Sequence, residues 1–222
     1  MPISSKKPLS SRNGLGQQAY DRLLQSIQNG SLRPSDRVVE EDIALKWGIS
    51  RTPVREALQR LEADGLLIHE PRKGLAIATL DHQMVVELYG IREVLEGAAA
   101  GFAAQHASPN EIRILKELCA IEPSLSADPA QGAKHNRRFH QTLCQIAHNR
   151  YLLKTLNSLT TSLALLGNYT RQIEGRAKQA VKEHAEIVAA IESRDAGAAE
   201  AAARAHIRAA MQARLSDISL LN

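Results

Sequence analysis

The fold of this chain is decided by residues 49–58, which read ISRTPVREAL. A helix is expected to begin near Thr52, because Pro53 fits the first turn of a helix, where a backbone amide needs no intrahelical acceptor. Apolar residues at helical spacing place another short helix at 39–47, which Gly48 ends. Only a few residues separate the two helices, and a glycine in so brief a link is typical of a helix-turn-helix.

The sequence on either side of this segment completes a small domain. Apolar residues recur at helical spacing over 15–30, and two short β-type stretches follow the third helix at 67–70 and 75–79. A basic turn joins these two stretches into a hairpin, or wing. We therefore expect a winged helix-turn-helix at residues 14–80, preceded by a flexible Ser/Lys/Pro-rich tail at 1–13.

The remainder of the chain, residues 81–222, is expected to form an all-helical bundle. Helical periodicity continues throughout it and is broken where Pro, Gly, Asp and Ser cluster. The expected helices lie at 81–106, 109–121, 128–148, 150–168, 175–193 and 196–217. The predicted fold class is therefore mainly α, with three helices and a β-hairpin wing followed by a helical bundle.

Composition agrees with a helical, globular protein and excludes several other classes. Aromatic residues make up only 3% of the 222 residues and charged residues 23%, which favours helix-on-helix packing over a β-sandwich or a disordered chain. No apolar run approaches the roughly 18 residues of a membrane span, and the first residues lack the apolar core of a signal peptide. The two cysteines stand far apart without a CxxC motif. We expect a cytoplasmic protein with no membrane partner.

Basic side chains gather in the first predicted domain. Residues 1–80 hold 12 Lys and Arg against 9 Asp and Glu, a net charge of +3 out of +4 for the chain. Arg51 and Arg55 lie at the start of the third helix, where a recognition helix meets the major groove and an arginine can donate two hydrogen bonds to guanine. Arg72 and Lys73 lie in the wing turn, which suits contacts to phosphate or the minor groove. The alternative is an ordinary solvated helix face with i,i+4 ion pairs. The combination favours double-stranded DNA as a partner.

Three histidines of the second domain lie on apolar helix faces. His184 falls on a stripe of Val and Ile residues, His206 lies among alanines, and His140 shares its face with Asn136. Side chains that point inward from three helices can converge on a cation, with the Asn136 oxygen as a further ligand. The alternative, which is more common for a single histidine, is a buried ring satisfied by a polar neighbour.

Arg92 interrupts an otherwise apolar stripe on the expected helix at 81–106. A buried guanidinium needs an anionic partner. Two partners fit this position. One is Glu96, four residues further along the same helix. The other is the carboxylate of a bound effector, held by two hydrogen bonds and contacting a metal ion on its other side.

The first domain resembles the winged helix-turn-helix of GntR-type bacterial transcription regulators, whose hallmark is the segment SRTPVREAL. This segment is present in full, and the following LQRLEADGLL and the wing PRKGLAI are also similar, so the resemblance spans residues 15–79. It implies that the protein binds an operator. The DNA contacts that it implies are Arg51, Thr52, Arg55, Lys73 and Gly74.

The sequence departs from this family at two places. The second helix begins with Glu40, Glu41 and Asp42, where many relatives have a basic residue. A carboxylate beside a DNA phosphate is repulsive, so we expect no DNA contact from Glu41. In the loop before this helix, Ser35 stands where a glycine is usual.

The second domain resembles the FCD domain, the all-helical ligand-binding domain of GntR-type regulators of the fatty-acid-regulator class. The resemblance rests on NRRFH at 136–140, on EHAEIVAAI at 183–191 and on His206. It implies a divalent metal ion, and zinc, nickel and manganese are all compatible with it. Asn136 replaces a more familiar aspartate, which removes one negative charge from the site. The implied metal ligands are Asn136, His140, His184 and His206.

The two resemblances together predict a ligand-responsive, DNA-binding transcription regulator, most often a repressor, that is not an enzyme. An arginine in the position of Arg92 commonly lines the FCD cavity, which favours a small carboxylic acid as the effector. A homodimer would bind a pseudo-palindromic operator. Two alternatives stay open. One is a metal-dependent hydrolase that uses the three-histidine site, with Glu183 and Glu186 as the nearby candidate bases. The other is an architectural DNA-binding dimer without an effector.

Overall fold

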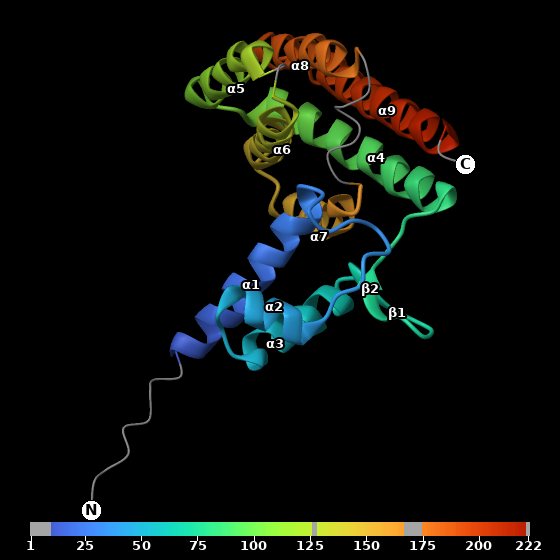
Figure 1. The fold of residues 1–222 in the computed structure, drawn as a ribbon. Coiled ribbons are helices and arrows are strands. Elements are labelled where there is room, and N and C mark those ends of the chain that lie inside the picture. The colour runs from blue at the N-terminus through green and yellow to red at the C-terminus, as the bar shows by residue number, and fades with distance from the viewer. Residues whose placement is uncertain (1–9, 126–127, 167–174, 221–222) are drawn as a thin grey trace, which may run out of the picture. The chain divides into compact units, whose positions relative to one another are not determined.

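The computed structural model describes residues 10–125, 128–166 and 175–220. The chain divides into two compact units, Met1–Thr79 and Leu80–Asn222, and each has its own set of buried apolar residues. Figure 1 shows that the first unit contains three helices and the hairpin, whereas the second is helical. The predicted fold class is therefore confirmed.

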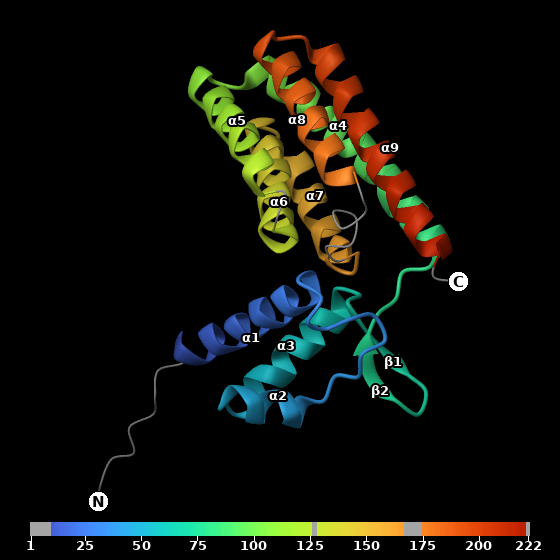
Figure 2. The same cartoon turned by 45° about the horizontal axis from the view of Figure 1, so that its top comes forward.

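The first unit is the expected winged helix-turn-helix. Figure 2 shows its three helices packed together, with the hairpin following the third. The strands pair antiparallel, with Leu67 opposite Ile77 and Glu70 opposite Gly74. The elements are α1 (Ser10–Gln28), α2 (Glu40–Trp47), α3 (Arg51–Ala63), β1 (Leu67–Glu70) and β2 (Gly74–Ile77).

The first unit is held together mainly by the contact between α1 and α3. Leu23 of α1 is 2% exposed, and Val54 and Leu61 of α3 are both 0% exposed. The two α3 residues lie one above the other on a single apolar stripe, as helical spacing predicts. A polar link joins the same helices at their edge, because the Tyr20 hydroxyl donates to Asp64 Oδ2 at 2.6 Å.

Two turn residues of the first unit adopt a left-handed backbone. Gly48, which ends α2, has a φ of 64°, so the predicted glycine stop is confirmed. Ser35 has a φ of 67°, a region that costs residues other than glycine roughly 1–2 kcal/mol. This conformation explains why a glycine is usual at the Ser35 position.

The ends of two elements differ from the sequence prediction. α1 begins at Ser10, so residues 10–13, which were expected in a flexible tail, are helical. Serine is compatible with the first turn of a helix, because the first amide hydrogens of a helix have no acceptor within it and the helix can begin at a polar residue. β2 runs from Gly74 to Ile77 rather than from Leu75 to Thr79, because its partner strand begins at Leu67, opposite Ile77.

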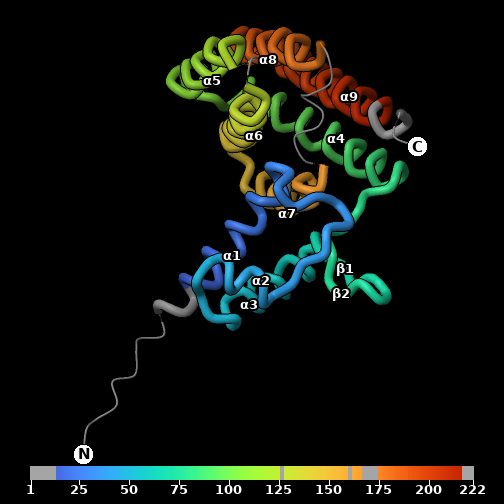
Figure 3. Tube along the Cα trace, viewed as in Figure 1, coloured from blue at the N-terminus to red at the C-terminus, as the bar shows by residue number. Residues whose placement is uncertain are grey.

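The second unit is the expected helical bundle. Figure 3 shows α9 running alongside α4, with α8 next to α9 and α5. Its main core contains Leu115, Phe139, Leu143, Ile187 and Ile191, all nearly inaccessible. None of the described helices combines the length and hydropathy needed to cross a bilayer. The elements are α4 (His82–His106), α5 (Pro109–Ile121), the 3-10 helix η1 (Glu122–Leu125), α6 (Pro129–Ile146), α7 (Arg150–Ala164), α8 (Arg176–Glu192) and α9 (Ala196–Leu220).

Side-chain caps occupy the helix breaks that the sequence indicated. Ser108 and Glu111 form a capping box at the start of α5. Asp128 accepts hydrogen bonds from two amides of α6, and Asn149 does the same for α7. These contacts satisfy amides that have no acceptor within the first turn.

The second unit differs from the prediction in one added element and at several helix ends, among them that of α6, which stops at Ile146 and not at 148. α7 ends at Ala164, and the last two residues of the helix expected at 150–168 lie outside the described residues. α9 continues to Leu220, three residues past its expected end. The helix η1 was not expected. It forms where Pro123 stops the α-helical run of α5, and it places Glu122 inside the bundle with 1% exposure.

Leu61→Ala is expected to lower the free energy of unfolding of the first unit by about 2–5 kcal/mol, because a wholly buried side chain leaves a cavity. Urea unfolding followed by the fluorescence of Trp47, the only tryptophan, measures this unit. Leu45→Ala is the control, since Leu45 of α2 is 84% exposed, and it should change the free energy by less than about 0.5 kcal/mol. Equal effects of the two substitutions would contradict the assigned core.

Candidate DNA-contact surface and metal centre

The exposed face of α3 carries the side chains that the sequence singled out for DNA. Arg51, Thr52 and Arg55 are exposed, whereas Val54 and Leu58 of the same helix are buried. Arg51 and Thr52 belong to the first turn, where backbone amide hydrogens have no partner within the helix. This face therefore offers guanidinium, hydroxyl and amide donors to an anion.

One carboxylate of α2 binds both of these arginines. Glu40 Oε1 accepts from Arg51 Nε at 2.8 Å and from Arg55 Nη2 at 3.0 Å, and Glu40 Oε2 accepts from Arg55 Nε at 2.9 Å. The hydrogen bonds from Arg55 and Arg51 lower the pKa of Glu40 to about 2. The arginines therefore pair with the neighbouring helix of the motif, and not along α3 as the alternative interpretation assumed.

The wing presents its basic residues at the tip of the hairpin. Arg72 and Lys73 are both exposed, and Lys73 Nζ lies 2.8 Å from Glu70 Oε2. Arg72 and Gly74 have φ values of 70° and 81°. Left-handed backbone at two positions makes the turn tight and leaves the two cationic side chains projecting from it.

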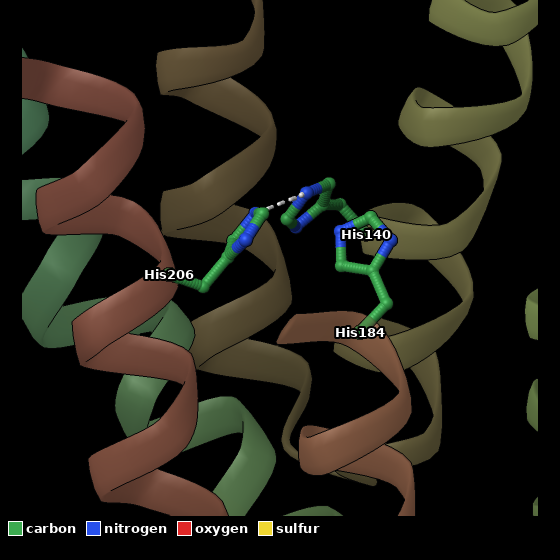
Figure 4. Close-up of side chains that lie close together, drawn as sticks. All are labelled: His140, His184 and His206. Atoms are coloured by element: carbon green, nitrogen blue, oxygen red, sulfur yellow. Dashed lines mark hydrogen bonds between the residues drawn. The ribbon is translucent and has the colours of Figure 1, made fainter. Parts of the chain in front are cut away.

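The three histidines that the sequence singled out lie together in the second unit. His140 of α6, His184 of α8 and His206 of α9 each offer a nitrogen, and these atoms all lie within 4.8 Å of one another. Figure 4 shows the three rings gathered between their helices, with a dashed line from His206 to His140. The two Nε2 atoms that this line joins are 3.3 Å apart. The three helix faces thus converge, as their apolar spacing predicted.

Each of the three histidines has a glutamate carboxylate next to its Nδ1 atom. A carboxylate bound to Nδ1 accepts a hydrogen there, so a neutral imidazole keeps its lone pair on Nε2. Carboxylates hold metal-ligating histidines in this way and fix both the tautomer and the orientation of the ring. The Nδ1 atoms of His140, His184 and His206 lie 2.7 Å from carboxylate oxygens of Glu96, Glu122 and Glu183, respectively.

The spacing of two of the three histidines suits a small divalent cation. Two nitrogens bound at about 2.0–2.1 Å to a tetrahedral zinc ion lie about 3.3–3.4 Å apart. The separation of 3.3 Å between His140 Nε2 and His206 Nε2 matches this value. Burial, together with the nearby His184 and His140, lowers the pKa of His206 well below its usual range. The ring is therefore neutral at pH 7, the form in which histidine binds metals.

Arg92 contacts this cluster through Glu96. Arg92 Nε donates to Glu96 Oε1 at 2.8 Å, while Glu96 Oε2 lies 2.7 Å from His140 Nδ1. Burial alone would raise the pKa of Glu96, but the charge of Arg92 and the contact with His140 lower it to about 2. Of the two partners that the sequence left open, the Glu96 pair is therefore present. Within the described part of the chain, no hydrogen bond engages the two terminal amino groups of Arg92.

Asn136 lies on α6 one helical turn before His140 and is half-buried. The two residues share the face of α6 that the sequence indicated, because positions i and i+4 of a helix lie one above the other. The role of Asn136 as an oxygen ligand stays a prediction.

Glu183 also has a second partner. Arg176 Nη2 lies 2.8 Å from Glu183 Oε2 and 3.4 Å from His206 Nδ1. Glu183 is therefore held between a guanidinium and an imidazole, where it orients His206. Glu186, the other base considered for a hydrolase, is exposed to solvent.

Sequence reasoning missed that glutamates hold the histidines, although it named Glu96 as a partner of Arg92 and Glu183 as a candidate base. Two of them carried a local signal, since Glu183 directly precedes His184 and Glu96 lies on the buried stripe of α4. Glu122 carried no local signal, because it is 62 residues from His184 in sequence and contacts that histidine from η1. The α2 carboxylate that binds the arginines was noted only as a repulsive charge.

Comparisons with known proteins identify relatives along most of the chain. A family model described as "FCD domain" matches residues 87–209, and one described as "Bacterial regulatory proteins, gntR family" matches residues 15–77. The chain is 34% identical over 195 residues to the uncharacterized HTH-type transcriptional regulator YdhC of Bacillus subtilis, covering 85% of this chain and 86% of the relative.

Two further comparisons agree with these matches. A probable D-xylose utilization operon transcriptional repressor of Paenarthrobacter nicotinovorans is 32% identical over 216 residues, which cover 96% of this chain and 93% of the relative. The solved structure of McbR/YncC from E. coli superposes with a TM-score of 0.76 at 23% identity, covering 93% of this chain and 96% of that chain. The structural likeness supports the same fold in both units.

Glu122→Ala is expected to lower the free energy of unfolding of the second unit by about 1–3 kcal/mol, because it removes the carboxylate from a wholly buried histidine. Urea unfolding followed by far-ultraviolet circular dichroism measures the change. In the control Glu117→Ala, a surface pair with Arg113 is lost, which should cost less than about 1 kcal/mol. If Glu122→Ala lowered the free energy of unfolding no more than the control does, the buried contact would not stabilise the bundle.

Proposed function

Because the chain belongs to the GntR family of bacterial regulatory proteins and carries an FCD domain, we propose that it is a transcription repressor whose operator binding is controlled by a small carboxylic acid. The observation that carries the proposal is that one chain holds both parts of such a regulator. The first unit exposes arginines at the start of a recognition helix. The second holds three histidines, each oriented by a carboxylate.

The first unit would bind operator DNA as half of a homodimer. Two copies of α3 would enter successive major grooves of a pseudo-palindromic operator. The wing tip, with its two exposed cations, suits the phosphate backbone or the minor groove. A protein with this role works in the cytoplasm, where bacterial DNA lies. The proposed DNA-contacting residues are Arg51, Thr52, Arg55, Arg72, Lys73 and Gly74.

The second unit would hold a divalent metal ion through His140, His184 and His206, with the Asn136 oxygen as a further ligand. Support comes from the 3.3 Å separation of two Nε2 atoms and from the carboxylate behind each ring. Such an ion supplies positive charge, and a coordination number of five or six would leave a position for a carboxylate oxygen beside these four ligands. Neutral imidazoles and an amide suit zinc, nickel or manganese.

Arg92 is the side chain that would bind the effector carboxylate directly, in addition to the metal ion. Its Nε is held by Glu96, which leaves the two terminal amino groups as a fork that matches the two oxygens of a carboxylate. Since Glu96 also contacts His140, an anion at Arg92 acts on the same chain of contacts that orients a proposed metal ligand. Effector binding would then change operator affinity by a coupling free energy of about 1–3 kcal/mol.

The enzyme alternative has no support from the relatives, which are named transcriptional regulators and not enzymes. The geometry agrees, because Glu183 is held by Arg176 and His206 instead of being placed to activate a water molecule. An architectural role without an effector differs from our proposal in one measurable respect. It predicts that no small acid changes the stability or the DNA affinity of the metal-loaded protein.

Arg51→Ala is expected to weaken binding to a duplex enriched from a randomised pool by about 1–3 kcal/mol, because the arginine would lose its contacts to a base. Fluorescence anisotropy measures the dissociation constant. Arg113→Ala removes the same charge from an exposed position of α5 and serves as the control. An equal loss on a scrambled duplex would show that Arg51 contacts phosphate and reads no base.

His184→Ala is expected to lower the amount of metal that the protein retains after loading with zinc and dialysis, because one of three nitrogen ligands is removed. Elemental analysis measures the stoichiometry. His148→Ala is the matched control, since the His148 side chain is 51% exposed and its Nε2 lies 3.0 Å from Glu111 Oε1, outside the three-histidine cluster. Unchanged zinc in His184→Ala would remove this residue from the ligand set.

A small carboxylic acid that fits the site is expected to raise the melting temperature of zinc-loaded protein. A ligand that binds only the native state adds about 2.7 kcal/mol at 100 times its dissociation constant. The increase should vanish in His184→Ala and shrink in Arg92→Lys, which keeps the charge but lacks the fork. If no acid in a broad panel shifted the melting temperature, the architectural role would replace the effector-controlled one.

A further inference from the structure

The two arginines of the recognition helix differ in how much of each guanidinium Glu40 occupies. Glu40 binds only Nε of Arg51, at 2.8 Å, but it binds both Nε and Nη2 of Arg55, at 2.9 and 3.0 Å. Arg51 Nη1 lies 3.7 Å from Glu41 Oε1, beyond hydrogen-bonding distance. Glu40 therefore binds the Nε side of both guanidiniums, and the terminal amino groups of Arg51, Nη1 and Nη2, both lie outside this contact.

The terminal amino groups of Arg51 matter because a guanine is recognised by two donors of one guanidinium, directed at O6 and N7. Arg51 keeps such a pair of amino groups on a side chain that is 56% exposed. Arg55 donates Nε–H and one hydrogen of Nη2 to Glu40, which leaves three of its five donors: both hydrogens of Nη1 and the second of Nη2.

Glu40 is well placed to hold this arrangement before DNA arrives. Its side chain is 20% exposed, much less than either arginine. It is the first residue of α2, where the helix dipole favours a negative charge. Exposed ion pairs add little stability. What this one contributes is orientation, because long arginine side chains otherwise lose rotamer freedom when they bind.

We propose that Glu40 is a positioning residue for DNA recognition, which holds Nε of Arg51 and so turns the terminal amino groups of that arginine toward a guanine. The inference rests on the proposed function as a DNA-binding regulator. It assigns a role in sequence reading to a carboxylate that does not itself contact DNA.

The test compares two substitutions of Glu40 with one of its neighbour. Glu40→Asp keeps the charge but shortens the side chain, so it cannot reach both arginines. Glu40→Gln keeps the length but removes the charge. Glu41→Gln is the matched control, because it removes the same charge from the same helical turn at a side chain that is 76% exposed. Circular dichroism and the fluorescence of Trp47 check that each variant is folded.

Each protein is titrated with two duplexes, one enriched from a randomised pool by the unaltered protein and one of the same composition in scrambled order. Glu40→Asp should lose about tenfold in affinity for the enriched duplex, the scale of one bidentate base contact. Its affinity for the scrambled duplex and the dependence on salt should be unchanged, because the net charge is the same. Glu40→Gln should also lose the preference for the enriched duplex, while Glu41→Gln keeps it.

A double substitution separates positioning from a general effect on folding. Arg51→Lys keeps the charge but lacks the two terminal amino groups of the guanidinium. Its affinity for the enriched duplex should therefore fall to the same extent as that of Glu40→Asp. The combined variant should lose no more than either single variant, because both remove the same base contact.

Three results would overturn the inference. Glu40→Asp could bind both duplexes as the unaltered protein does, or the losses of the two single variants could add in the double variant. Tighter binding of Glu40→Gln to both duplexes would show that Glu40 only repels DNA. If the unaltered protein enriched no sequence from the pool, the proposed function would fail before any variant was compared, and this inference would fail with it.

Discussion

The three inward imidazoles depend on one constraint, which is that a polar group removed from water must have a partner. His184 and Glu122 have no exposed side-chain surface and lie 2.7 Å apart. The other two histidines meet the same requirement through glutamates on neighbouring helices. The contacts join α6 to α4, α8 to η1, and α9 to α8. The polar cluster therefore connects most of the helices that surround it, and the apolar side chains of the core pack around these contacts.

The same contacts connect the proposed metal centre with the proposed effector position. Glu96 binds Arg92 with one oxygen and His140 with the other, so a change at the guanidinium alters the partner that orients the imidazole. Such a chain of short contacts between charged groups, buried in a medium of low polarity, is sensitive to an added anion. This coupling is a physical reason why a regulator would place an arginine within an apolar helix stripe.

In both units an acidic side chain orients a nitrogen-bearing side chain, but the proposed ligand differs. In the bundle, a carboxylate on Nδ1 leaves Nε2 of a histidine directed at its neighbours. In the winged domain, the carboxylate of Glu40 takes Nε of Arg51 and leaves the terminal amino groups directed outward. In both cases an acidic side chain fixes which nitrogen atoms are presented. A carboxylate near a binding site can therefore support recognition without contacting the ligand.

The sequence by itself determined the helical domains, the helix-turn-helix and the three inward histidines. These features depend on local signals, such as the stop at Gly48 and the spacing of His184 among apolar residues. Local signals also missed the start of α1 at Ser10, because a first turn tolerates residues that are otherwise typical of a tail. Only the tertiary structure decided which carboxylate meets which nitrogen, as in the contact of Glu122 with His184 across 62 residues. Such pairs depend on how distant segments pack, and helical periodicity shows which residues face inward but not which of them will touch.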